Sequence, residues 1–328
     1  MSKEEQQQHI TSIGGQAVME GVMMRGPKEI ATAVRKSNGE IIIDKKEVSS
    51  VFTKYKFLKI PILRGVISFF ESMITGVKCL MFSAEQADLE DGEDYKPSKF
   101  EQWLDDKFGD KVKDIVIYFS VFVSLIFSVG LFILLPTVLV GWLKKFIVSA
   151  PVLSLCEGGV RIVIFLAYLF LVSRMKDIQR VFEYHGAEHK CINCIEHGMT
   201  LTVDHVRESS KQHKRCGTSF LIIVMLISIL FFMVVRVDNV LLRMASRIIL
   251  VPVIAGVSYE FLRLAGRSDN PVVNLLSKPG LWMQNLTTSE PDDCMIEVAI
   301  AAVEAVFDWK AYLRENFPDT EIPEEETR

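Results

Sequence analysis

The sequence predicts an α-helical integral membrane protein with about four transmembrane helices, one further amphipathic or re-entrant helix and a small β-rich N-terminal module. The mean hydropathy is positive, and the apolar residues come in blocks long enough to cross a bilayer. The first 12 residues are polar and charged, so no secretory signal peptide is expected. We therefore expect membrane lipids around the chain, and the net charge of −4 gives no reason to expect nucleic acid as a partner.

Residues 1–60 are expected to form the β-rich module, on the cytosolic side of the membrane. The turn Ser37-Asn38-Gly39 separates two runs rich in β-branched residues, 31–36 and 40–45. An Asn-Gly pair in this setting is a strong hairpin signal. The segment 13–27 (IGGQAVMEGVMMRGP) holds four glycines, which interrupt a helix. We interpret it as a turn-rich structural segment, with a ligand-binding loop as the alternative.

Residues 61–90 predict a helix from Ile62 to Ala87, preceded by Pro61. Charged side chains recur on it every seven residues, and a ridge of small residues follows the 3–4 spacing of a helix-packing face: Gly65, Ser68, Ser72, Gly76, Cys79 and Ser83. Holding Glu71 and Lys78 near the bilayer centre would cost roughly 2.5–3.5 kcal/mol each. We therefore expect an interfacial or re-entrant helix, with a fifth span as the alternative. Residues 91–113 are expected to be an acidic, solvated linker.

Residues 114–266 are expected to form the four-helix membrane domain. Its spans are predicted at Ile115–Val140, Gly159–Ser173, Thr218–Val235 and Ile248–Leu264. Arg161, near the start of the second span, is expected to extend toward the membrane surface. Lys and Arg are most frequent in the loop 174–217, which predicts that this loop and both termini are cytoplasmic.

Residues 267–328 are expected to be a cytosolic C-terminal segment. Its first part, Arg267–Glu290, is interpreted as loop-like. Ser289 is then predicted to cap an amphipathic helix whose first turn holds Pro291, Asp292 and Asp293. The apolar face of this helix is expected to dock on the rest of the protein, and consists of Ile296, Ala299, Ile300, Val303 and Phe307. The acidic end of the chain, Asp319–Glu326, is expected to be a disordered tail.

The stretch Glu183–Cys216 contains five of the six histidines and three of the six cysteines. Both side chains suit a zinc-like metal, so their clustering predicts a metal site. His185 and His189 belong to an H-x-x-E-H motif, which on a helix places both imidazoles on one face. Glu188 can then act as a general base on a water whose pKa a metal lowers.

Two arrangements of this stretch remain open from spacing alone. In the catalytic arrangement, His185 and His189 bind the metal, the fourth position stays open for water, and the third ligand is His213, Cys216 or Glu196. In the structural arrangement, a closed site is made by Cys191, Cys194, His213 and Cys216. The reduced thiols of the cytoplasm favour metal binding over a disulfide in either case.

Several motifs also resemble the YqhQ-like family of bacterial membrane proteins, known as domain of unknown function 1385: EYHGAEHK, RCGTSF, GGQAVMEGVMMRGP, IPILRGV and TTSEPDD. That family is commonly labelled a predicted metal-dependent enzyme. The resemblance implies that His185, Glu188, His189, His213, Arg215 and Cys216 are family features. The usual His-Pro-Arg-Cys of the family reads His213-Lys214-Arg215-Cys216 here. Cys191 stands where a non-cysteine is expected, which favours the histidine-based site.

We therefore expect a metal-dependent, hydrolytic enzyme at the cytoplasmic face of a bacterial inner membrane, with a divalent metal for which zinc is favoured. The expected metal ligands are His185, His189, His213 and Cys216. Glu188 would be the base, and Arg215 either an anion or transition-state partner or an anchor of the third span. The alternative is a non-enzymatic scaffold or membrane-protein assembly factor, which would bind other membrane proteins and hold a structural metal. The sequence identifies no substrate.

If His185 and Cys216 bind one metal, the path of the chain between the second span and His185 is constrained. Cys216 closely precedes the third span, whereas His185 follows Met175 by ten residues. One straight helix would carry His185 roughly 15 Å below the membrane surface. The chain must therefore bend or tilt strongly after Ser173, with Ile178, Val181 and Phe182 turned inward.

Overall fold

The computed structural model describes residues 9–48, 56–87, 112–147, 149–235, 237, 239–266 and 270–322. The expected acidic linker falls outside these residues except for its last two positions, and the acidic tail falls outside them beyond residue 322. The chain divides into two compact units. Unit 1 comprises residues 1–88, 169–224 and 255–328, and unit 2 comprises residues 89–168 and 225–254.

Unit 1 contains a four-stranded antiparallel sheet in the order β1-β2-β3-β4. Its strands are β1 (Gly14–Val18), β2 (Gly21–Arg25), β3 (Glu29–Arg35) and β4 (Ile41–Glu47). The hairpin at Asn38-Gly39 is confirmed, with Gly39 at a φ of 87°. The turn-rich interpretation of residues 13–27 is wrong, because most of this segment forms the β1–β2 hairpin. The glycine at position 21 permits close strand pairing, since a Cβ there would lie 2.1 Å from the Ala33 carbonyl oxygen.

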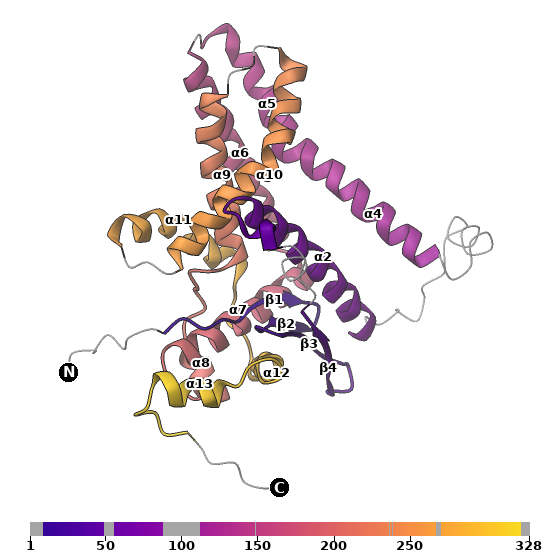
Figure 1. Ribbon diagram of the computed structural model, residues 1–328. Coiled ribbons are helices and arrows are strands. Elements are labelled where there is room, and N and C mark those ends of the chain that lie inside the picture. The colour runs from indigo at the N-terminus through magenta and orange to yellow at the C-terminus, as the bar shows by residue number, and fades with distance from the viewer. Residues whose placement is uncertain are drawn as a thin grey trace. The chain divides into compact units, whose positions relative to one another are not determined.

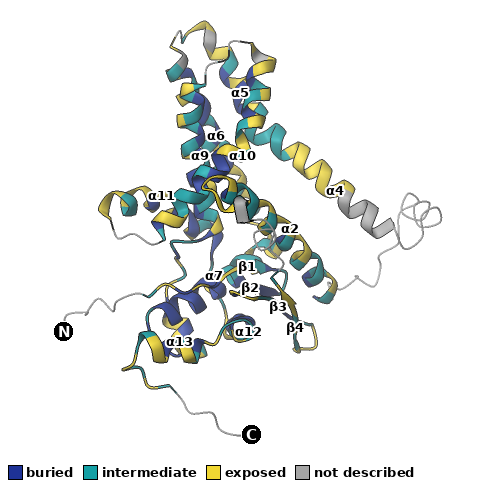
Figure 2. Cartoon of the chain, viewed as in Figure 1, coloured by how far each residue is buried: buried dark blue, intermediate teal, exposed yellow. Residues whose placement is uncertain are grey.

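Helices α7 (Lys176–Glu196) and α12 (Asp293–Glu304) pack against this sheet (Figure 1). They enclose the hydrophobic core of unit 1, to which α8 (Val203–Glu208) and α13 (Trp309–Asn316) also contribute. Figure 2 shows that the later turns of α7 are almost wholly buried. The docking face predicted for the C-terminal helix is confirmed, with Ile296, Ala299 and Val303 in the core. The predicted cap is wrong by three residues: Asp292, not Ser289, accepts the hydrogen bond from the Met295 N–H.

Residues 271–287 are not a loop but a helix, α11 (Pro271–Thr287). The Asn270 side chain accepts a hydrogen bond from the Val272 N–H, and Pro271 occupies the first turn, where proline is tolerated. Buried positions recur every three or four residues along it, at Ser277, Gly280, Met283, Gln284 and Thr287. The prediction failed because proline and glycine within this segment outweighed a weak helical pattern.

Five helices of the described chain, rather than about four, are long and apolar enough to cross a membrane. They are α2 (Leu63–Gln86), the segment Phe119–Gly141, the segment Pro151–Val172 of α6 (Ala150–Val172), α9 (Gly217–Val234) and the segment Leu241–Ala265 of α10 (Val240–Ala265). The additional one is α2, for which an interfacial or re-entrant position was expected. Its small-residue ridge is a packing face: Gly65 lies against Gly256, and Gly76 lies against Gln16.

The first apolar segment remains helical past Pro136. It consists of α4 (Val112–Val129), a π-helical segment η3 (Gly130–Leu134) and α5 (Leu135–Gly141). A proline cannot donate to the carbonyl four residues earlier, which here is that of Phe132. The Arg161 Nε donates to this oxygen at 2.9 Å. Arg161 is therefore 7% exposed and hydrogen-bonded within unit 2, so the expectation that it extends to the surface is wrong.

The predicted bend after the second apolar segment is confirmed. Helix α6 ends at Val172, and α7 begins at Lys176 after Met175 adopts an extended conformation with φ −77° and ψ 130°. On the first turns of α7, Gln179 and Arg180 are exposed, whereas Ile178, Val181 and Phe182 are half-buried, as expected. The break starts α7 as a separate helix, and its histidines lie in the later, packed turns.

Candidate metal centre

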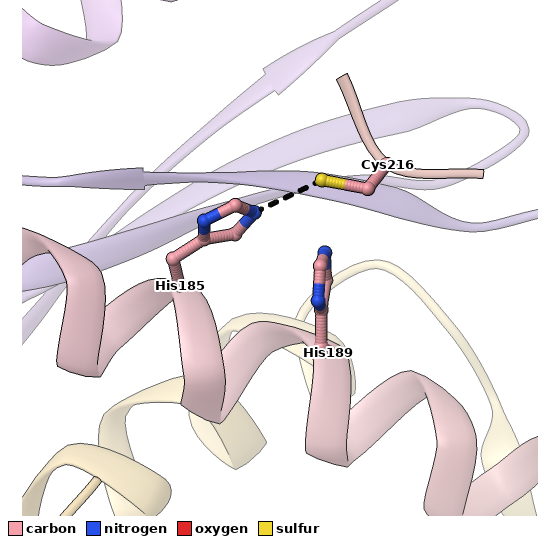
Figure 3. A group of neighbouring side chains, drawn as sticks. All are labelled: His185, His189 and Cys216. Carbon is pink, nitrogen blue, oxygen red and sulfur yellow. Dashed lines mark hydrogen bonds between the residues drawn. The ribbon is translucent and has the colours of Figure 1, made fainter. Parts of the chain in front are cut away.

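Three side chains in unit 1 converge as a candidate metal centre: His185, His189 and Cys216 (Figure 3). The histidines lie one turn apart on α7, and Cys216 immediately precedes α9. Their ligand atoms lie within 4.8 Å of one another. The Cys216 Sγ is 3.3 Å from the His185 Nε2. Two ligands of a tetrahedral zinc are separated by roughly 3.3–3.8 Å at usual Zn–N and Zn–S bond lengths, so this spacing fits such an ion.

Backbone carbonyls orient both imidazoles. The Nδ1 of His185 is 2.8 Å from the Thr287 carbonyl oxygen, and the Nδ1 of His189 is 2.7 Å from the Lys211 carbonyl oxygen. A carbonyl can only accept, so in the neutral form of each imidazole Nδ1 carries the proton and Nε2 keeps a lone pair. Metal-binding histidines are usually fixed in this way by a second hydrogen bond. In the neutral imidazoles the two Nε2 atoms therefore suit metal coordination.

The Cys216 sulfur accepts a hydrogen bond from the Thr218 N–H at 3.4 Å and lies 3.1 Å from the Thr218 hydroxyl. Its position at the start of α9 adds a favourable helix dipole for a thiolate. Burial opposes ionisation, but the two histidines outweigh it and hold the pKa of Cys216 well below its usual value. The site therefore favours a negatively charged sulfur, the form that binds metal.

The same electrostatics act on the histidines. Burial disfavours the imidazolium of His189, but Glu188 and Cys216 outweigh it and raise the pKa of His189 to about 9. Burial also opposes protonation of His185, and the contact with Cys216 raises its pKa nonetheless. The carboxylate and the thiolate thus stabilise positive charge at this point, whether protons or a metal cation carry it.

Glu188 is buried beside the trio. Its Oε2 lies 3.6 Å from the His189 Nε2 and 4.0 Å from the His185 Nε2. Strand β1 makes room for it, because a Cβ on Gly15 would stand 2.8 Å from the Glu188 Cγ and 2.7 Å from the Met23 carbonyl oxygen. Gly15, the second residue of β1, therefore has a steric role at the site.

Gly186, inside the H-x-x-E-H motif, permits another close contact. A Cβ at this position would lie 2.0 Å from the Ser289 carbonyl oxygen. The Ser289 N–H also donates to the Phe182 carbonyl oxygen at 2.9 Å. The segment 287–289 therefore lies directly on α7, and this contact brings the Thr287 carbonyl to His185.

A cavity of about 380 Å³ opens on the candidate centre. It lies within unit 1 and is bounded by the segment Ser12–Gln16, part of α2, the turn before α9 and α7. His185, Glu188, His189 and Cys216 all line it, together with Arg25 and Arg215. The alternative interpretation of residues 13–27 as a ligand-binding segment thus gains support, because these residues form one wall of the cavity.

His213 and Arg215, both expected to serve the site, also line the cavity but bond to Glu196. The His213 Nε2 is 3.4 Å from a Glu196 oxygen, and its ring centroid is 5.7 Å from that of His189. Arg215 pairs with Glu196 and donates to the Thr11 carbonyl oxygen at 2.8 Å. Burial opposes ionisation of Glu196, but His213 and Arg215 outweigh it and lower its pKa to about 2. Neither His213 nor Glu196 belongs to the converging trio.

Cys191 and Cys194 face the hydrophobic core and do not join Cys216. Both are 0% exposed and belong to the core cluster. The Cys194 thiol donates toward the carbonyl oxygens of Met199 and Thr200 at 3.7 and 3.4 Å. Burial raises the pKa of Cys191 well above its usual value and that of Cys194 to about 12. The geometry therefore gives no support to the closed cysteine-rich site.

Several contributors to the site could not be identified from their residue types. The carbonyls of Thr287 and Lys211 act through the backbone, which carries no residue-specific signal. Gln284 holds the His213 backbone by accepting from its N–H and donating to its carbonyl, both at 2.8 Å. The motifs GGQAVMEG and TTSEPDD were conspicuous in the sequence, but only the packing against α7 assigns them a role.

Comparison with known proteins agrees with the resemblance of the motifs. The family model described as "Protein of unknown function (DUF1385)" matches residues 60–309. The chain is similar to the "Uncharacterized protein YqhQ" of Bacillus subtilis (strain 168), with 35% identity over 314 residues. This alignment covers 92% of the chain and 94% of that relative. No solved structure matches the chain.

Proposed function

We propose that this chain, which belongs to DUF1385, a family of unknown function, is a metal-dependent hydrolase of the bacterial inner membrane. The observation that carries the proposal is the convergence of His185, His189 and Cys216 beside the buried carboxylate of Glu188. These three ligands leave a coordination position for water or substrate, as catalytic zinc sites do. The mixed nitrogen and sulfur donors favour zinc among divalent ions.

Each residue has a distinct role in this proposal. A metal held by the three ligands would supply a Lewis acid and lower the pKa of a water molecule toward neutrality. Glu188 takes the proton from the attacking water and returns it to the leaving group. The Thr287 and Lys211 carbonyls hold the two imidazoles in the tautomer that leaves each Nε2 unprotonated. Arg215, which lines the cavity, contacts an anionic group of the substrate or transition state.

The proposed setting is a multi-pass protein with five spans and both termini in the cytoplasm. Ser72 and Thr75 of α2 line the cavity, so one of its walls is a helix that is itself long and apolar enough to cross a membrane. This arrangement suits a substrate, with an amide or ester bond, that reaches the centre from the membrane or from its surface.

The scaffold alternative has less support. In a scaffold, the small-residue ridge of α2 and the soluble termini would be binding surfaces, but Gly65 and Gly76 of that ridge are buried inside the chain. A structural metal would also require a fourth protein ligand. The nearest expected one, His213, is hydrogen-bonded to Glu196 instead.

Replacement of Glu188 by Gln tests the proposal. We expect Glu188→Gln to retain bound zinc, because Glu188 is not one of the three ligands, and to lose turnover. The full chain, loaded with zinc, would be incubated with lipid and soluble extracts from bacterial membranes. Untargeted mass spectrometry would then identify each species whose signal decreases while two new species appear. The masses of the two products should sum to the mass of the substrate plus one water.

The matched control is Glu183→Gln on the same helix. Hydrolysis by the wild type and by Glu183→Gln, with none by Glu188→Gln or by metal-free protein, supports the proposal. Equal hydrolysis by Glu188→Gln would exclude Glu188 as the base. A zinc-loaded wild type that hydrolyses nothing in any extract favours the scaffold.

A further inference from the structure

Unit 2 contains a buried group of charged side chains that the proposed hydrolysis does not use. Its members come from α6 and α10: Glu157, Arg161, Arg243 and Arg247. They are between 2% and 7% exposed. We refer to these four residues as the arginine cluster. All four lie in helices that are long and apolar enough to cross a membrane, where ionisable residues are rare and usually functional.

Glu157 is the centre of the hydrogen bonds in the cluster. One of its oxygens accepts from Arg161 Nη2 and Arg247 Nε, both at 3.2 Å, and from the Thr137 hydroxyl at 3.0 Å. Its other oxygen accepts from Arg247 Nη2 at 3.3 Å. Arg161 also donates to the Phe132 carbonyl and, at 3.0 Å, to the Ser228 hydroxyl. The carboxylate and Arg161 are therefore well satisfied.

Two guanidinium donors in the cluster are not satisfied. The Nη1 of Arg247 and the Nε of Arg243 are buried and have no hydrogen-bond partner among the residues that the structure describes. Arg247 is 2% exposed, and its guanidinium carbon lies 3.8 Å from the centroid of the Phe232 ring. Unsatisfied buried donors on charged groups are costly, so they indicate where a ligand would be stabilised.

The balance of charge in unit 2 also indicates a bound anion at the arginine cluster. Arg161 and Arg247 both bond to the Glu157 carboxylate, and Arg243 lies one turn before Arg247 on α10. Glu157 is the only acidic residue among the side chains of unit 2 that the structure describes. An isolated buried lysine or histidine can lose its proton, but arginine stays charged at any physiological pH. An excess of buried positive charge is strongly unfavourable in an apolar bundle unless an anion accompanies it.

We propose that the arginine cluster binds a phosphate-type oxyanion, either free phosphate or the phosphodiester of a membrane lipid. Guanidinium groups bind such oxygens through paired, charge-assisted hydrogen bonds. Arg243 is the fourth residue of α10, and Arg247 follows one turn later. The open donors thus lie near the start of an apolar helix, at a depth that a lipid headgroup can reach.

The test uses the full chain in a phosphate-free, non-ionic detergent and follows the midpoint of thermal unfolding, Tm. Inorganic phosphate is titrated against chloride at equal ionic strength. We expect phosphate to raise the Tm of the wild type with the logarithm of its concentration. Arg243→Met should weaken the apparent affinity for phosphate by about tenfold or more, because it removes one charged donor group. It should also raise the Tm in chloride, because it removes buried charge.

The matched control is Arg263→Met, which removes an exposed arginine near the other end of α10. It should respond to phosphate as the wild type does. If Arg243→Met does not fold, Arg243→Lys keeps the charge but loses the planar pair of donors, and should also bind phosphate more weakly. An equal response to phosphate in the wild type and in both Arg243 variants would overturn the proposal.

A second arm distinguishes the two sources of the oxyanion. Native mass spectrometry would compare protein reconstituted with phosphatidylglycerol and with a phosphate-free glycolipid. A phosphatidylglycerol molecule that the wild type and Arg263→Met retain, and Arg243→Met loses, assigns the site to a lipid. Stabilisation by free phosphate without lipid retention assigns it to the soluble anion. Asp238 lies outside the described residues, so Asp238→Asn is included. If that change lowers the Tm while phosphate and lipid have no effect on the wild type, the counter-ion is internal and the proposal fails.

Discussion

Helix α7 carries two sets of potential metal ligands on successive turns, and their surroundings are opposite. His185 and His189 face a cavity, Glu188 and Cys216. Cys191, two residues further along, is 0% exposed in the hydrophobic core, as is Cys194. A step of two residues turns a helix by about 200°, so side chains this close in sequence point in opposite directions. Proximity in sequence, which made the cysteine pair a plausible site, therefore says little about which ligands share a metal.

The pKa values of the three thiols on and beside α7 also differ. The histidines lower the pKa of Cys216, whereas burial in apolar surroundings raises the pKa of Cys191 and Cys194. A thiol becomes a metal ligand as the thiolate. Charged neighbours rather than burial thus distinguish the candidate ligand from the structural cysteines, because all three thiols are buried.

The largest expected difference between the two sets is in bound metal. Zinc content of the purified full chain should fall from about one equivalent to near zero in His185→Ala, His189→Ala and Cys216→Ser, because three protein ligands are the minimum of a catalytic zinc site. Cys191→Ser and Cys194→Ser should keep their zinc. The measurement is elemental analysis after dialysis against a weak chelator.

His213→Ala sharpens this measurement. It was an expected ligand, but its Nε2 lies 3.4 Å from Glu196. It should retain zinc if the centre has an open position. Zinc lost from the Cys191 and Cys194 variants but kept by His185→Ala would reverse the comparison and restore the closed cysteine-rich site.

Local spacing explains what the sequence could predict of this centre. The pairing of His185 with His189 follows from helical periodicity, and the break after Ser173 follows from the demand that His185 and Cys216 share a site. The Asn38-Gly39 hairpin was predictable for the same reason, since a turn of defined chemistry determines it.

Contacts between distant segments explain what could not be predicted. Gln284 holds the His213 backbone across 71 residues, and Glu196 binds the Thr11 N–H across 185 residues. The residues next to each of them in the sequence do not indicate such distant partners. Arg161 was misjudged similarly, because Glu157, the Phe132 carbonyl and Ser228 satisfy it inside the bundle. The helix α11 was missed because its stability comes from packing, as at Gly280 against Ser219, rather than from intrinsic propensity.

The second prediction concerns Glu196, at the end of α7. Its pKa in the folded protein is about 2, below the value of about 4.3 for an unfolded glutamate. The stabilisation is therefore fully present above pH ~4.3 and is lost as the pH falls toward 2, by an amount on the order of 3 kcal/mol. Unfolding by denaturant at a series of pH values should show this loss in the wild type.

In Glu196→Gln the free energy of unfolding should depend much less on pH between about 4.3 and 2 than in the wild type. The variant should also be less stable at neutral pH, because Arg215 and His213 lose their partner. Glu208→Gln, at an exposed position of α8, is the control, and its free energy of unfolding should depend on pH as that of the wild type does. If the free energy of unfolding of Glu196→Gln depends on pH as strongly as that of the wild type, other carboxylates are responsible for the acid sensitivity of unit 1.

The third prediction compares two adjacent glycines beside the candidate centre. In Gly15→Ala the new Cβ meets the Met23 carbonyl oxygen at 2.7 Å and the Glu188 Cγ at 2.8 Å, whereas at Gly14 nothing lies within 4 Å. Overpacking of this kind costs about 1–3 kcal/mol. We expect Gly15→Ala to lower the free energy of unfolding by that amount, and Gly14→Ala to change it by less than about 0.5 kcal/mol. Equal effects of both changes would show that Glu188 is not confined by β1.

The smallest expected effect distinguishes the two core cysteines from each other. In Cys191→Ser a hydroxyl enters a position that is 0% exposed within the core cluster, which destabilises a protein by about 1–3 kcal/mol when the hydroxyl finds no partner. In Cys194→Ser the hydroxyl can donate to the Thr200 carbonyl oxygen, which the thiol already approaches at 3.4 Å. That change should cost less than about 1 kcal/mol. Denaturant unfolding of the zinc-loaded protein measures both. If Cys191→Ser is instead the milder change, Cys191 lies near a polar group or water, and its contrast with Cys216 is weaker than the packing indicates.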